Sequence, residues 1–206
     1  MNRCVIIGGA DIHDYDRIRD DLRDSDFLIC CDSGLKHAEP LRIVPSLIVG
    51  DFDSHEKPDT DTEIIELPRE KDDTDTVFAA REAVRRGFRE FLLIGVTGAR
   101  FDHTFGNVSL LLWLDSQEIK AEIADDYCRM EIVSRKTAVI DGRYSFFSLL
   151  NISGKAEDIT IRGAKYPLEG ADIRSDYQYG ISNEVLPGET AEVSVGEGRL
   201  LLVKVF

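Results

Sequence analysis

The chain has 206 residues, 43% of them hydrophobic, and a formal net charge of −14. This acidic balance argues against a protein that binds the phosphates of nucleic acid through a basic surface, and it is compatible with metal cations or a cationic substrate. No apolar stretch is long enough to span a bilayer, so we expect no membrane segment. The four cysteines form no CxxC pair, and Cys30 and Cys31 are adjacent, so a zinc site or disulfide framework is not expected and the cytoplasm is the expected location.

The first 126 residues alternate short apolar runs with longer helical patterns. The runs are closed by Gly, Asp or Pro and predict strands over 3–10, 27–34, 46–54, 63–68, 90–98 and 120–126. The intervening patterns predict helices over 15–25, 35–43, 76–87 and 101–118, and Gly87 occupies the position of a helix C-cap glycine. Such alternation predicts an α/β domain, Rossmann-like, with a mostly parallel sheet covered on both faces.

After Asp126 the pattern changes to short alternating or apolar runs separated by Gly and Asn turns. These runs predict strands over 129–135, 137–142, 144–150, 157–163, 191–198 and 199–206, with no helix. We therefore expect two domains, an α/β domain over 1–126 and an antiparallel β-sandwich over 127–206.

Polar residues follow several strands of the first half, where the carboxyl ends of parallel strands form one edge. They are Asp32, Asp51, Asp53, Lys71, Asp72, Asp73, Asp75, Arg100, Asp102 and His103. Carboxylates so close together repel each other, and Mg²⁺, an oxygen-liganded cation that shares its shell with phosphates, is the simplest way to neutralise them. Cations such as Lys71 and Arg100 suit phosphoryl chemistry, so we predict a Mg²⁺–nucleotide site, without a P-loop motif.

Several of these residues also have a purely structural interpretation. Asp75 would be a helix cap, Arg100 a surface ion pair, and His103 a residue on a helix face. The "GGA" at 8–10 is interpreted only as a close-approach turn after the first strand. The functional interpretation is favoured because several such features are expected on a single edge.

The segments "CDSGLKHA", "VPSLIVGDFDS", "KDDTDT", "GARFDHTFGNVSLL", "YPLEG" and "GISNE", in this order, resemble those of thiamine pyrophosphokinases. The resemblance runs from about residue 4 to residue 205. It implies an α/β nucleotide domain followed by a β-sandwich. It also implies that the thiamine hydroxyl attacks the β-phosphorus of ATP, giving thiamine diphosphate and AMP.

The resemblance also implies roles for matching residues. Asp51, Asp53 and Asp75 are similar to the family's Mg²⁺ and phosphate-handling carboxylates, and Asp102 to a further acid that orients or deprotonates the hydroxyl. ATP contacts are expected at Asp32, Lys71, Asp72, Thr74, Arg100 and His103. Thiamine contacts are expected at Tyr166, Ser182 and Asn183 of the sandwich domain, across a homodimer with shared active sites.

The sequence departs from the family pattern in the loop after the second strand, which commonly carries two glycines and an Asn. Here the loop reads "DSGLK", with Ser33 and Lys36 at two of these positions. Two alternatives stay open at this point. One is a pyrophosphokinase acting on another alcohol, such as a pterin, and the other is a non-catalytic nucleotide or thiamine sensor.

Overall fold

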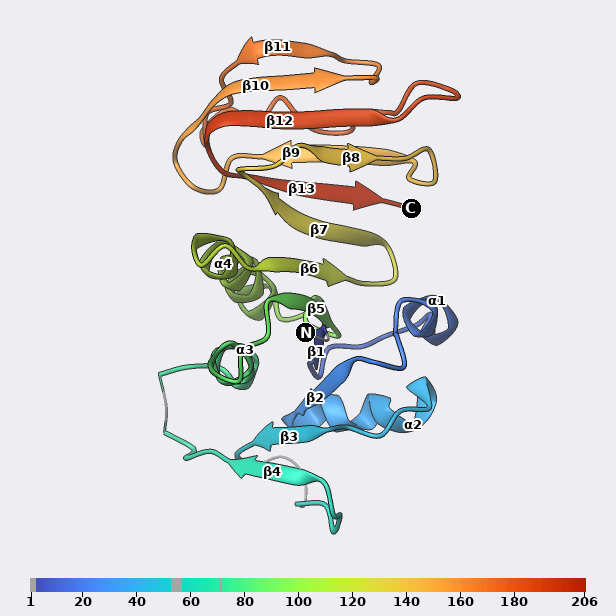
Figure 1. Ribbon diagram of the computed structural model, residues 1–206, viewed down its shortest axis with the longest axis vertical. Helices are drawn as coiled ribbons and strands as arrows, with labels where there is room; N and C mark the ends of the chain where they lie inside the picture. The colour runs from blue at the N-terminus through green and yellow to red at the C-terminus, as the bar shows by residue number, and fades with distance from the viewer. Residues whose placement is uncertain (1–2, 53–56, 71) are drawn as a thin grey trace. The chain divides into compact units, whose positions relative to one another are not determined.

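The computed structural model describes residues 3–52, 57–70 and 72–206, which form two compact units, one up to Asp126 and one from Tyr127 to Phe206 (Figure 1). Each unit is described separately. Of the described helices, none is long and apolar enough to cross a membrane.

The first unit is built on a parallel sheet with the strand order β4-β3-β2-β1-β5-β6. Its strands are β1 (Cys4–Ile7), β2 (Phe27–Cys31), β3 (Leu47–Gly50), β4 (Glu63–Glu66), β5 (Glu90–Ile94) and β6 (Lys120–Ala124). The predicted parallel sheet is therefore confirmed. Because the chain runs outward from β1 to β4 and then returns to β5, the topological switch point lies between β1 and β5.

Helices cover both faces of this sheet (Figure 1). The helices α3 (Asp75–Arg85) and α4 (Phe101–Ser116) contact each other on one face, and α1 (Tyr15–Asp20), the 3₁₀ helix η1 (Asp32–His37) and α2 (Ala38–Leu41) lie on the other. The prediction of a single helix over 35–43 was wrong in form, because a 3₁₀ helix fills its first part. Gly87 follows α3 with φ +95°, as expected for a residue just beyond a helix end.

Alternation along β2 places its cysteines on opposite faces, as predicted. Cys30 belongs to the apolar cluster on the α1 and α2 face, together with Val5, Ile7 and Ile18. Cys31 faces α3, where its Sγ lies 3.7 Å from the carbonyl oxygen of Asp75. All four cysteines are buried and unbridged, and burial raises the pKa of Cys4 and of Cys30 to about 12. These thiols therefore stay protonated and serve as core residues.

The second unit contains two antiparallel sheets with the strand orders β7-β13-β9 and β11-β10-β12-β8. Its strands are β7 (Cys128–Val133), β8 (Ala138–Ile140), β9 (Phe146–Leu150), β10 (Ala156–Arg162), β11 (Leu168–Ala171), β12 (Ala191–Gly198) and β13 (Leu200–Val205). The strand β11 was not predicted, because its four residues include only two hydrophobic ones, Leu168 and Ala171.

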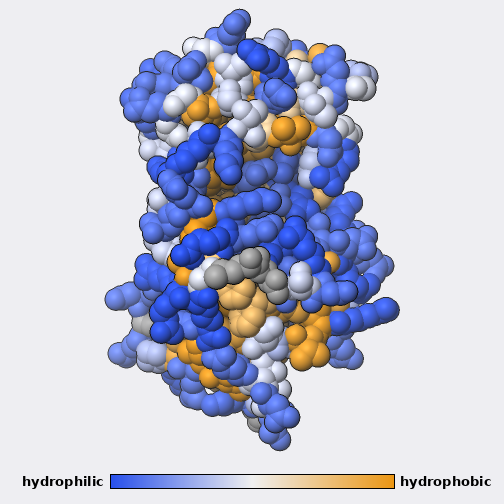
Figure 2. Space-filling model, viewed as in Figure 1, coloured by the Kyte–Doolittle hydropathy of each residue, from blue (hydrophilic) through white to orange (hydrophobic). Residues whose placement is uncertain are grey.

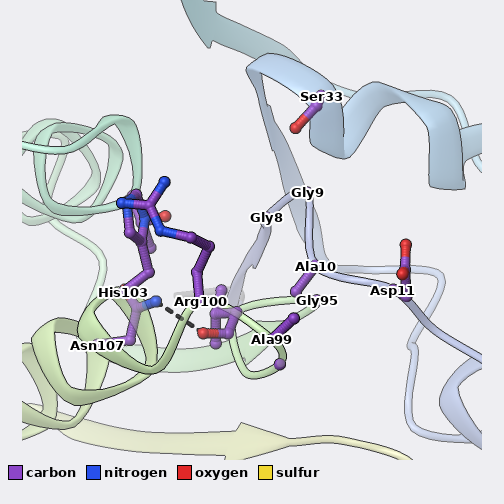
Figure 3. A pocket seen from close by; sticks show the side chains of 13 residues that line it. Gly8, Gly9, Ala10, Asp11, Ser33, Gly95, Ala99, Arg100, His103 and Asn107 are labelled. Atoms are coloured by element: carbon purple, nitrogen blue, oxygen red, sulfur yellow. Dashed lines mark hydrogen bonds between the residues drawn. The ribbon is translucent and has the colours of Figure 1, made fainter.

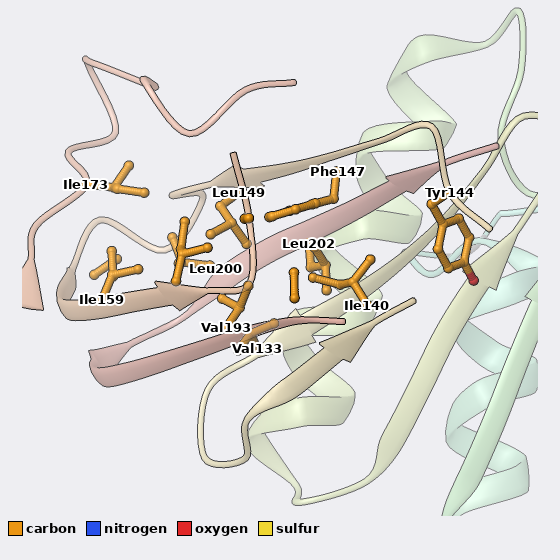
Figure 4. Packing of buried hydrophobic residues seen from close by; sticks show 14 residues of the cluster. Val133, Ile140, Tyr144, Phe147, Leu149, Ile159, Ile173, Val193, Leu200 and Leu202 are labelled. Carbon is orange, nitrogen blue, oxygen red and sulfur yellow. The ribbon is translucent and has the colours of Figure 1, made fainter. Parts of the chain in front are cut away.

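The core of the second unit lies between these two sheets (Figure 4). Phe147, Leu149 and Leu202 project from the three-stranded sheet, and Ile159 and Val193 project from the four-stranded sheet. Burying a Leu, Ile, Val or Phe side chain contributes about 1.5–3 kcal/mol each. The predicted β-sandwich is confirmed.

Candidate functional site

A pocket of about 340 Å³ opens at the switch point of the first unit, at the carboxyl ends of β1 and β5 (Figure 3). In open α/β sheets, ligands bind at this kind of position. It is lined by Gly8, Gly9, Ala10, Asp11, Ser33, Thr76, Gly95, Val96, Gly98, Ala99, Arg100, His103 and Asn107. Asn107 is buried and its amide donates a 2.8 Å hydrogen bond to the carbonyl of Val96, which fixes the loop after β5.

The floor of the pocket is backbone. The amide of Gly8 donates to the carbonyl of Ile94 at 2.9 Å, and the amide of Ala10 donates to the carbonyl of Gly95 at 2.8 Å. A Cβ on Gly8 would lie 2.5 Å from the carbonyl oxygen of Gly95, so a side chain there would force the two loops apart. The close approach expected for "GGA" is confirmed. Its place in a pocket was missed, although paired glycines after the first strand of a parallel sheet were a usable signal.

Three carboxylate residues surround the carboxyl ends of β2 and β3 in the first unit. Cys31 pairs with Val49, so Asp32 and Gly50 follow at the same level, and a Cβ on Gly50 would lie 3.1 Å from the Cα of Asp32. Asp51 comes next in the chain. The contact between Cys31 and the Asp75 carbonyl brings the start of α3 to the same place.

Asp75 does not cap its helix. Thr74 is the N-cap of α3, and its Oγ1 accepts a 3.4 Å hydrogen bond from the amide of Val77. Asp75 is the first helical residue, where its charge is favoured by the helix dipole. The structural interpretation of Asp75 as a capping residue is therefore wrong, and its carboxylate is not used as the cap.

The chemistry of this acidic group fits a hard cation. Asp32 has a positive φ of 42°, and its Oδ1 is buried with no hydrogen-bond donor in the described part of the chain. A buried carboxylate oxygen needs a donor or a cation. Across 3–52, 57–70 and 72–206, no three His, Cys, Asp or Glu side chains form a metal site by themselves. Mg²⁺ commonly uses only one or two carboxylates and completes its shell with water and phosphate, so the residues present fit it. Asp53 and Lys71 lie outside the described residues.

Arg100 and Asp102 form a two-point ion pair at the start of α4. Arg100 Nε donates to Oδ1 of Asp102 at 3.0 Å and Nη2 donates to Oδ2 at 2.7 Å. Both side chains are exposed, so the pair contributes little to stability. The Arg100 guanidinium holds the pKa of the Asp102 carboxyl well below its usual range. The carboxylate is therefore a weak base for as long as the pair persists.

The structure also places the other predicted residues of the first unit. Arg100 and His103 both line the pocket, and His103 is exposed on α4, as its structural interpretation proposed. Asp72 and Thr74 are exposed just before α3, and their neighbour Thr76 lines the pocket. Asp11, Ser33, Thr76 and Asn107 were not among the predicted site residues.

The predicted residues of the second unit lie close to one another, but they differ in how far they are exposed to solvent. Tyr166 is 59% exposed, Ser182 is exposed with φ +58°, and Asn183 is 4% exposed. The carboxamide of Asn183 accepts from the amide of Tyr166 at 3.0 Å and donates to its carbonyl at 2.8 Å. The side chain thus replaces a strand partner and holds Tyr166 at the surface. The resemblance had implied that Asn183 contacts thiamine directly.

Comparisons with known proteins cover both units. Residues 18–123 match the family described as "Thiamin pyrophosphokinase, catalytic domain", and residues 131–200 match "Thiamin pyrophosphokinase, vitamin B1 binding domain". A thiamine pyrophosphokinase of Bacillus subtilis is 27% identical over 170 residues, which is 79% of each chain.

Solved structures give the same result. The crystal structure of a thiamin pyrophosphokinase from Geobacillus thermodenitrificans is 28% identical, with a TM-score of 0.84, 99% of this chain and 97% of that chain covered. For the Bacillus subtilis thiamine pyrophosphokinase, the TM-score is 0.88 at 23% identity, with 99% of both chains covered, which supports the fold alone. These matches give no support to a pterin kinase or a non-catalytic sensor.

Proposed function

The chain belongs to the thiamine pyrophosphokinase family, and on that premise we propose how its residues transfer the pyrophosphoryl group of ATP to thiamine. The observation that carries the proposal is the pocket at the switch point. The floor of this pocket is glycine backbone, and Arg100 supplies a cation to its lining. The pocket lies at the carboxyl edge of the sheet, where Asp32, Asp51 and Asp75 also lie.

In the reaction, the hydroxyl oxygen of thiamine forms a bond to the β-phosphorus of ATP. The bond between this phosphorus and the oxygen bridging to the α-phosphorus breaks, and AMP leaves with that oxygen. The hydroxyl proton passes to a base, for which we propose Asp102. As long as Arg100 bonds to Asp102, the carboxylate is a poor base, so Arg100 must be drawn to phosphate oxygens first.

We infer that Asp51 and Asp75 hold Mg²⁺, together with Asp53, which lies outside the described residues. When bound, the cation would neutralise negative charge on the transferred phosphates. Asp32 lies against Gly50 at the same sheet edge, and we propose that its buried Oδ1 binds a water of the cation.

The remaining predicted ATP contacts are also part of the proposal. Arg100 suits phosphate because its planar guanidinium bonds two oxygens at once. His103 lines the same pocket. Asp72, Thr74 and Lys71 belong to the segment that leads into α3, whose N-terminus favours negative charge.

For thiamine we propose that Tyr166 is the contacting residue and that Asn183 positions it. Tyr166 is exposed and held at both backbone groups by Asn183, while Lys165 Nζ lies 5.7 Å from the centre of its ring. An aromatic face attracts a cationic ring such as a thiazolium. The exposed Ser182 is the remaining predicted contact.

We further propose a cytoplasmic homodimer with shared sites. Each unit exposes large apolar side chains, such as Phe101 and Phe105 on α4 and Tyr177 and Ile181 in the second unit. The face of the molecule drawn in Figure 2 is mostly hydrophilic. Exposed apolar residues of this kind are consistent with a second copy covering them.

The proposed activity is tested by measuring AMP release with and without thiamine and Mg²⁺. Release that requires both is expected. Asp51→Asn should lower turnover strongly at limiting Mg²⁺ while leaving the fold intact, and Asp16→Asn, an exposed residue of α1, serves as the control. Near-normal turnover of Asp51→Asn at limiting Mg²⁺ would remove Asp51 from the metal site.

Shared sites are tested by complementation. An Asp53→Asn subunit is mixed with a subunit carrying Tyr166→Ala and Asn183→Ala, each inactive alone. Subunit exchange should restore activity, because one site of the mixed dimer then has no defect. No recovery in the presence of proven mixed dimers would mean that each site lies within one chain.

A further inference from the structure

The pocket at the ends of β1 and β5 differs chemically from one side to the other. Arg100 and His103 lie on one side of the segment 8–10, and Asp11 lies on the opposite side (Figure 3). Between them the floor is glycine backbone. A ligand that fits both sides is anionic at one end and rich in hydroxyl donors at the other. A nucleoside triphosphate has this polarity, with the phosphates at one end and the ribose diol nearer the other.

Asp11 is paired with Lys36 but retains a free acceptor oxygen. Lys36 Nζ donates to its Oδ1 at 2.9 Å, and within the described residues its Oδ2 has no hydrogen-bond partner. The ammonium of Lys36 also holds the pKa of Asp11 below its usual value, so the carboxylate is ionised at neutral pH. An ionised carboxylate only accepts hydrogen bonds, and it repels phosphate. It therefore selects a hydroxyl donor.

Ser33, at the start of η1, supplies a second polar group to the lining of this pocket. A Cβ added to Gly9 would collide with the Ser33 Oγ, so the hydroxyl lies directly over the backbone of the pocket floor. It makes no hydrogen bond to any other described residue. A carboxylate acceptor and a hydroxyl in the lining of one pocket are the groups that can bind the hydroxyls of a ribose.

On the basis of the function proposed above, we propose that Asp11 and Ser33 bind the ribose hydroxyls of ATP and make the enzyme select ribonucleotides over deoxyribonucleotides. Lys36 is then a positioning residue, which orients Asp11. At the two positions where the loop after β2 departs from the family pattern, Ser33 lines the pocket and Lys36 bonds to Asp11.

The test compares ATP with 2′-deoxy-ATP and 3′-deoxy-ATP in two assays, thiamine-dependent release of the nucleoside monophosphate and calorimetric titration without thiamine. The wild-type protein should prefer ATP by about 10- to 100-fold in kcat/KM, as for a site with a charged hydrogen bond to a substrate hydroxyl. Asp11→Ala should reduce this preference to about threefold or less, mainly through KM, and Ser33→Ala should reduce it less.

The matched control is Asp16→Ala, which removes another exposed aspartate that is paired with a basic side chain, Arg19. It should keep the full preference. Equal use of ATP and both analogues by the wild type, or full preference in Asp11→Ala, would overturn the inference while leaving the proposed function intact. If no nucleotide yields product, the proposed function fails, and the inference then stands or falls with the binding preference measured by calorimetry.

Discussion

Replacing Asn183 with alanine should loosen the surface segment that carries Tyr166 without changing the rest of the fold. The change removes three hydrogen bonds, two to the backbone of Tyr166 and one from the amide of Glu184 at 2.9 Å. Each contributes about 1 kcal/mol net. Because Tyr166 lies at the surface, water recovers part of this, so we expect the free energy of unfolding to fall by about 2–3 kcal/mol.

Hydrogen exchange gives the most direct assay, because the amides of Tyr166 and Glu184 both donate to the Asn183 Oδ1. If the free energy of local opening falls by about 2–3 kcal/mol, the exchange of these two amides should become about 30- to 150-fold faster. Urea unfolding measures the change in the free energy of unfolding of the whole protein. The control is Ser182→Ala, an exposed neighbour expected to change stability by about 0.5 kcal/mol or less. Unchanged protection at Tyr166 in Asn183→Ala would refute the positioning role of Asn183.

Three further predictions concern the first unit. Gly8→Ala should cost about 1–3 kcal/mol of stability through the clash with Gly95, whereas Gly106→Ala, which has open space in α4, should gain about 0.5–1 kcal/mol; equal effects in urea unfolding would contradict the packing argument. Burial lowers the pKa of His37 below 6.5, so the unfolded chain binds a proton more readily and the free energy of unfolding should fall as the pH drops below 6.5. His37→Gln should lack this part of the pH dependence. A variant with the same pH profile as the wild type would contradict the assignment to His37. Arg100→Lys should lower kcat by about 10- to 1000-fold, since Lys keeps the charge but loses the two-point grip on phosphate; steady-state kinetics with unchanged kcat would make Arg100 structural.

The parallel sheet was predictable because its central strands are buried and read as short apolar runs, such as Cys4–Ile7 and Leu47–Gly50, in which every residue is buried. The carboxyl-edge residues followed from topology, because all parallel strands end on the same side. Asp32 and Asp51 could therefore be expected near each other without any knowledge of side-chain contacts.

The missed features depend on contacts between distant segments. The role of Asn183 depends on an isolated bridge to Phe147 and on Tyr166, which is 17 residues away, and no local pattern encodes it. The 3₁₀ form of Asp32–His37 depends on Gly34 packing against Ile7, which excludes a side chain at that point. The pocket itself arises only when the loops after β1 and β5 meet.

The glycine floor restricts how this enzyme can evolve a different nucleotide preference. Gly8, Gly9 and Gly95 leave no volume for a side chain, so mutations there are expected to be purged for their effect on folding before any new specificity is tried. The rim is different, because Asp11 and His103 are exposed and can be exchanged at small cost in stability, whereas Arg100 is constrained by its proposed contact with phosphate. Natural variation among relatives, and libraries built to alter substrate choice, should therefore concentrate on the rim of the pocket and leave its floor unchanged.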